Sequence, residues 1–270
     1  MCDCKLTPEM NHSVRSIVPF DISDLKCEAL MKLFQETTSY IQDIRIEMMA
    51  SRRSYREQEE HPATTLGITV QRPTIRFADS LIRERRIDTI AHELVHILLV
   101  YRFGLRMIER RIHHPASNQD IFDYFLNLNR FWDYFLSQTV NTVHHRILIA
   151  YLKEEYGIAS DLYLTLFRHN FRILSKSHYP DRESQYAKGV AAFEYEKLVG
   201  KIDMAINLYR QSEFFWKAYS SAQEHFENYD FQAIPTASTY EENVLSFLED
   251  LGYQKHDFTF LPETALEGIA

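Results

Sequence analysis

Glycine and proline are scarce in this chain of 270 residues, which has 7 glycines and 8 prolines. Tight turns depend on these two residue types, so their scarcity predicts long elements joined by few turns. Apolar residues make up 45% of the chain and charged residues 25%, as in an ordinary globular protein, which excludes a largely disordered chain. We therefore predict an α+β fold that is mostly α.

Cysteine is also scarce, with Cys2, Cys4 and Cys27 as its only occurrences. An odd number, with two at the extreme N-terminus, does not form a disulfide framework. No apolar run comes near the roughly 20 residues that span a bilayer, and residues 1–11 lack the apolar core of a signal peptide. We expect a cytoplasmic protein without a membrane partner.

The net charge is −8, and all of the acidic excess lies after residue 115. General nucleic-acid binding needs a basic surface, so no nucleic-acid partner is expected.

Periodic patterns predict helices, strands and their ends. Two β-like runs, Gly67–Gln71 and Pro73–Ala78, are expected strands of a small sheet beside the following helix, and they pair with each other or each pairs elsewhere. Asp88 is the expected N-cap of a helix from Thr89 to Phe103, which Gly104 ends in the left-handed conformation. The other predicted helices are Leu25–Met49, Asp120–Tyr156, Leu162–Ser177, Glu183–Val199, Asp203–Tyr229 and Glu241–Leu251.

One short pattern carries chemistry: His92-Glu93-Leu94-Val95-His96. On a helix, residues i and i+4 lie on one face, so His92 and His96 can direct two imidazoles at one metal ion. Glu93 projects beside the ion, where it can take a proton from a zinc-bound water. The composition gives only roughly 0.05 chance occurrences of this pattern per chain. We predict a zinc ion, Zn²⁺, with His92 and His96 as ligands and Glu93 as the catalytic base.

The segment from Thr89 to Leu98 resembles the His-Glu-x-x-His motif of the zincin metallopeptidases. It has Thr three residues before the first His, uncharged flanking residues and an apolar end. The resemblance implies an edge strand ahead of the helix that binds an extended substrate, and Pro73–Ala78 lies where that strand is expected. It also implies hydrolysis of peptide bonds in a peptide or protein substrate.

The sequence says less about which branch of the zincins this segment resembles. The metzincin pattern requires Gly and His where this chain has Leu99 and Arg102, so that branch is excluded. A thermolysin-like enzyme has a downstream Glu ligand, whereas Glu109 comes too soon and Glu154 too late. The region around residues 141–153 resembles an uncharacterised bacterial zincin-like group, and regulatory metallopeptidases of the ImmA/IrrE type rank second.

A catalytic zinc usually has a third protein ligand. His144 is the first choice, because in the bacterial group a Glu-His pair occupies this place and His144 would replace the Glu. His145 and the acidic pair Asp120 and Asp123 remain alternatives, and His113 and His114 come after them. For the residue that stabilises an oxyanion, the candidates are His145 and Tyr151.

The remaining predictions concern organisation and rival functions. Residues 1–160 are expected to form the zincin-like metal-binding domain, and residues 161–270 a helical region packed on it. Arg102, Arg106 and Arg110 recur every four residues, which is typical of a solvated helix face. Two rivals to a metallopeptidase remain open: a metal-binding regulatory or scaffold protein without turnover, and a helical interaction protein whose motif is accidental.

Overall fold

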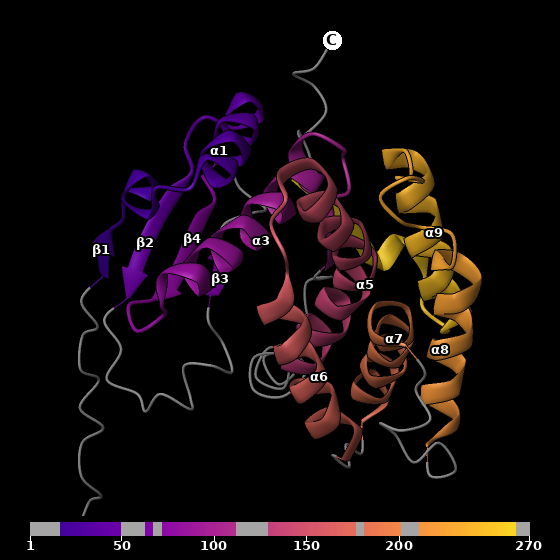
Figure 1. Ribbon diagram of the computed structural model, residues 1–270. Helices are drawn as coiled ribbons and strands as arrows, with labels where there is room; N and C mark the ends of the chain where they lie inside the picture. Colours follow the sequence, from indigo (N-terminus) through magenta and orange to yellow (C-terminus); the bar gives the residue numbers. More distant parts are fainter. Residues whose placement is uncertain are drawn as a thin grey trace, which may run out of the picture.

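The computed structural model describes residues 17–49, 63–66, 72–111, 129–176, 181–200 and 211–262. The fold is α+β and mostly helical, as predicted, with the sheet at one side and the later helices at the other (Figure 1). The elements in chain order are β1 (Ile17–Pro19), η1 (Ile22–Leu25), α1 (Glu28–Tyr40), β2 (Arg45–Met49), β3 (Ala63–Leu66), β4 (Thr74–Ala78), α3 (Arg83–Tyr101), β5 (Met107–Arg110), α5 (Asn129–Tyr156), α6 (Asp161–Lys176), α7 (Arg182–Val199), α8 (Glu213–Phe226), α9 (Ala237–Asp250), η5 (Lys255–Asp257) and β6 (Phe258–Leu261).

The larger sheet has the strand order β1-β2-β4-β3. The predicted strand at Pro73–Ala78 is β4, but it lies inside the sheet between β2 and β3, so the expectation that it forms an edge was wrong. The strand at that edge is β3, which pairs antiparallel with β4. The predicted strand at Gly67–Gln71 lies outside the described residues.

The helix predicted over Leu25–Met49 is interrupted. Helix α1 ends at Tyr40, and β2 follows at Arg45. No glycine or proline marks this change, which is why the periodic pattern misled the prediction. In β2, Ile46 is buried and lies opposite Ile75 of β4 in parallel register, so pairing within the sheet outweighs the local helical pattern.

Helix α3 carries the predicted metal-binding motif into the centre of the molecule. It begins at Arg83, a turn and a half before Asp88, so Asp88 is not its N-cap. The end is as predicted: Gly104 has φ +70°, and the Leu105 N–H donates to the Leu99 carbonyl at 2.9 Å. Every residue from 88 to 101 is buried except Glu93.

Asp88 caps a different helix. Its Oδ2 accepts a hydrogen bond from the Leu162 N–H, in the first turn of α6, at 3.0 Å. Burial raises the pKa of this carboxyl group to about 6. The carboxylate therefore ties the start of α6 to α3, and this long-range contact is invisible to a local capping rule.

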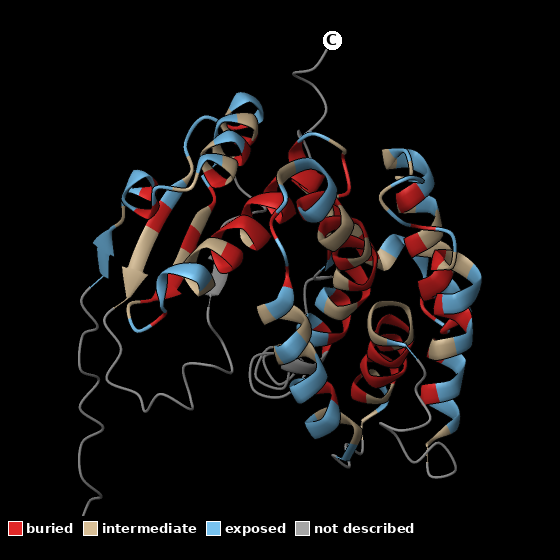
Figure 2. Ribbon diagram, viewed as in Figure 1, coloured by how far each residue is buried: buried red, intermediate tan, exposed pale blue. Residues whose placement is uncertain are grey.

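The larger of two hydrophobic clusters extends from Ile22 to Phe260 and includes residues of α3, α5, α7, α8 and α9, and the smaller one is formed by residues of α6, α7 and α8. Figure 2 shows that buried residues concentrate in α3 and α7, whereas α6 is largely exposed or half-buried. Strand β6, near the end of the described chain, pairs with β5, which follows α3. The domain boundary at residue 160 stays a prediction. None of the described helices has the combination of length and apolar character that a membrane crossing requires.

The predicted basic helix face does not exist, because α3 ends before it. Arg102 pairs with Glu36, and Arg106 pairs with Glu241 at 2.6 Å. The Arg110 guanidinium lies 4.6 Å from the centre of the Trp132 ring. Each arginine thus joins a different pair of elements.

Candidate metal centre

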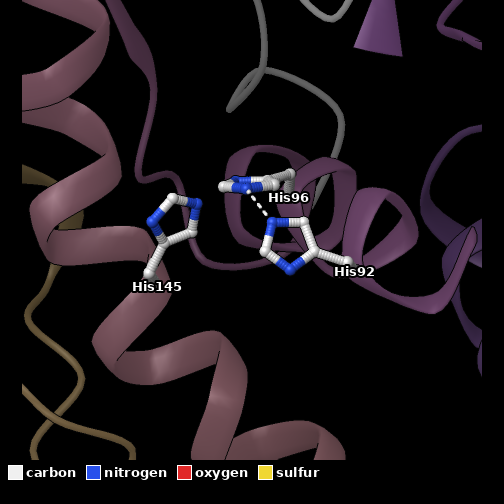
Figure 3. Close-up of side chains that lie close together, drawn as sticks. All are labelled: His92, His96 and His145. Carbon is white, nitrogen blue, oxygen red and sulfur yellow. Dashed lines mark hydrogen bonds between the residues drawn. The ribbon is translucent and has the colours of Figure 1, made fainter. Parts of the chain in front are cut away.

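Three buried histidines converge where α3 meets α5. His92 and His96 come from α3 and His145 from α5, and one ligand nitrogen from each lies within 4.8 Å of the other two (Figure 3). The Nε2 atoms of His92 and His96 are 3.1 Å apart. Two imidazole nitrogens at about 2.0 Å from a tetrahedral zinc ion are separated by roughly 3.3 Å. The cluster could therefore hold a metal ion.

His144 lies beside this group but contacts it differently. Its Nδ1 is 3.1 Å from Nδ1 of His96, on the side of that ring opposite to His92. Its Nε2 is 2.9 Å from the Leu105 carbonyl oxygen. Adjacent residues on a helix point about 100° apart, so His144 and His145 approach the group from different directions. The geometry favours His145 as the third ligand.

Hydrogen bonding assigns the proton of His96. Burial lowers the pKa of His144 to about 3 and that of His96 well below its usual value, so both rings are neutral. The Leu105 carbonyl can only accept, so His144 donates from Nε2 and accepts at Nδ1. His96 therefore donates from Nδ1. The lone pair of its Nε2 is left facing His92, in the state that binds a metal.

His145 is oriented by a buried carboxylate. Its Nδ1 is 2.7 Å from Oε1 of Glu194, a fully buried residue of α7. Because Nδ1 is bound there, Nε2 is the nitrogen available to an ion, and Figure 3 shows the ring turning one nitrogen toward His96. A carboxylate behind a ligating histidine fixes its tautomer and makes it a better ligand.

Tyr163 of α6 completes the surroundings of the cluster. Its hydroxyl donates to Glu194 at 2.9 Å and also contacts Nδ1 of His145. Its ring stacks on His92, with centroids 4.6 Å apart. Burial and the neighbouring Glu194 raise the pKa of Tyr163 well above its usual value, so the hydroxyl keeps its proton. Neither Glu194 nor Tyr163 was predicted, because nothing in their local sequence distinguishes them from other helical residues.

The other predicted site residues fall into three groups. Glu93 lies on α3 directly after His92 and is half-buried, whereas both histidines are buried. Tyr151 is engaged elsewhere, since its hydroxyl donates to Glu36 at 2.8 Å and accepts from Arg102. The alternative ligands His113, His114, Asp120 and Asp123 lie outside the described residues.

Comparisons of the chain with protein-family models, curated proteins and solved structures found no match. The function of the protein is therefore inferred from the geometry of the histidine cluster and from its chemistry.

Proposed function

We propose that this protein is a zinc-dependent peptidase. The observation that carries the proposal is the convergence of His92, His96 and His145 nitrogens within 4.8 Å, with Glu93 next to His92 on the same helix. Two nitrogens from one helical turn and a third from a second helix would take three of the four corners of a tetrahedron. Catalytic zinc sites have three protein ligands of this kind and an open fourth position.

Zinc is the metal that the donor set favours. Three neutral imidazoles suit zinc, and three ligands leave room for a water. When bound at such a site, zinc lowers the pKa of a coordinated water and polarises a carbonyl group.

Glu93 supplies the acid–base chemistry in this proposal. It accepts a proton from the water that attacks the carbonyl carbon of the peptide bond, and donates it to the nitrogen as the carbon–nitrogen bond breaks. No oxidant or reductant is needed. Tyr163 and Glu194 keep His145 in the ligating tautomer.

The proposed substrate is an extended stretch of peptide. Strand β3 stands at the edge of the sheet and packs against α3, the helix that carries the motif. An edge strand presents unpaired backbone groups to which a peptide can add as a further strand.

Burial of the cluster favours a second candidate, a metal-binding regulatory protein without turnover. His92, His96 and His145 are only 8%, 9% and 6% exposed, and the Tyr163 ring covers His92. A structural metal site is closed in this way, whereas a catalytic site admits substrate.

Removal and return of the metal separates the two candidates. We expect the chelated protein to be inactive on an unfolded protein substrate, and one equivalent of zinc per chain to restore cleavage. Cleavage would be measured by mass spectrometry of the products, with the Glu93→Gln variant as the control for a contaminating protease. Zinc binding without cleavage of any unfolded substrate would support the regulatory protein instead.

A further inference from the structure

Two of the three clustered histidines have a hydrogen-bond partner on the nitrogen that faces away from the group. His96 contacts His144 through Nδ1, and His145 contacts Glu194 through Nδ1. His92 differs, because its Nδ1 is buried and has no partner among the described residues. With an ion bound at Nε2, His92 carries its proton on Nδ1, and leaving this buried N–H unsatisfied costs roughly 1–3 kcal/mol, so a partner for this atom is expected.

Asp88 is placed to be that partner. It lies four residues before His92 on α3, so the two side chains are on the same face, one turn apart. The residue is only 8% exposed. Its Oδ2 is held by the Leu162 N–H at 3.0 Å, while its Oδ1 is buried and has no partner in the described part of the chain.

Two further buried polar atoms lie on residues near Asp88 or Leu162 in the sequence. The hydroxyls of Thr89, the neighbour of Asp88 in α3, and of Ser160, two residues before Leu162, are also buried without partners in the described chain. Ser160 leads into the helix that Asp88 caps, whereas the Thr89 side chain projects about 100° around α3 from Asp88. Buried polar groups without a protein partner are commonly satisfied by ordered water.

We propose that Asp88 is a positioning residue for His92. Its Oδ1 accepts a hydrogen bond from Nδ1–H of His92, directly or through one buried water, and so holds the lone pair of Nε2 toward the ion. Each ligand then has an outer partner: Asp88 behind His92, His144 behind His96 and Glu194 behind His145. This inference rests on the proposed function, because it presupposes that the three histidines bind a metal.

The test compares zinc affinity in Asp88→Asn with that in the wild type and in Thr89→Val. The amide can still accept from the Leu162 N–H, but its NH₂ group cannot accept from His92. Removal of an outer partner lowers metal affinity by roughly 10–100-fold, and we expect a loss in that range. Thr89→Val removes a buried hydroxyl from the same turn without touching the carboxylate, so its affinity should equal that of the wild type.

A second readout does not depend on the stability of the variant. In zinc-loaded wild type, the Nδ1–H proton of His92 should resonate as far downfield as that of His145, which is bonded to Glu194. It should move upfield in Asp88→Asn, while the His145 signal stays in place. Unchanged affinity and an unchanged His92 signal would reduce Asp88 to a cap of α6 and overturn the inference. A wild type that binds no zinc would instead overturn the proposed function.

Discussion

Glu93→Gln is expected to lower peptide hydrolysis by roughly 10²–10⁴-fold, the usual contribution of a positioned acid–base group. Zinc content and thermal stability should remain those of the wild type. Gln keeps the size and polarity of the side chain but cannot take up a proton at neutral pH. Residue 93 projects about 100° around α3 from His92, so the change leaves the three ligating rings untouched.

The matched control for this variant is Glu84→Gln. Glu84 lies in the first turn of the same helix with its side chain 72% exposed, so its neutralisation changes the net charge equally without reaching the cluster. Cleavage rates of an unfolded protein would be measured for all three forms. Equal rates for wild type and Glu93→Gln, with metal content matched, would remove Glu93 from the mechanism.

Loss of the His145 imidazole is expected to weaken zinc binding by more than 100-fold, beyond the roughly 10–100-fold that removal of an outer partner costs. His145→Asn is the better variant, because the amide still offers a donor to the buried Glu194. Replacement of His144 should lower zinc affinity by only roughly 10–100-fold, because this residue contacts His96 through the nitrogen that faces away from the ion.

The affinities would be measured by competition with a chelator, and His169→Ala, which removes an exposed histidine of α6, is the control. A larger loss in His144→Asn than in His145→Asn would restore the ligand predicted from the sequence.

The arrangement of His92 and His96 on one helix could be predicted from the sequence alone. The spacing of His92 and His96 is a helical repeat, and the helix that carries them forms with its predicted left-handed end at Gly104. The sequence alone did not decide whether His144 or His145 is the third candidate ligand. The two differ by one step around α5, and which of them faces α3 depends on how that helix packs against α7. Glu194 lies 49 residues from His145 in the sequence, and only the folded structure shows that the two side chains are in contact.

The wrong predictions about the fold also concern residues whose contacts lie far away in the sequence. The stretch Arg45–Met49 can follow a helical pattern, and pairing with its neighbours β1 and β4 makes it a strand. Asp88 matched the rule for an N-cap, yet it caps α6, 74 residues later in the chain. Long-range pairing decided both cases, and a single sequence does not display it.

Diffraction at the zinc absorption edge, from crystals of zinc-loaded protein, would locate the ion. We expect about one zinc per chain and one anomalous peak, at about 2.0–2.1 Å from a nitrogen of each of His92, His96 and His145. At His145 this nitrogen should be Nε2, because Nδ1 is bound to Glu194. No peak after loading, or an ion held without His92 and His96, would show that these histidines do not form a zinc site.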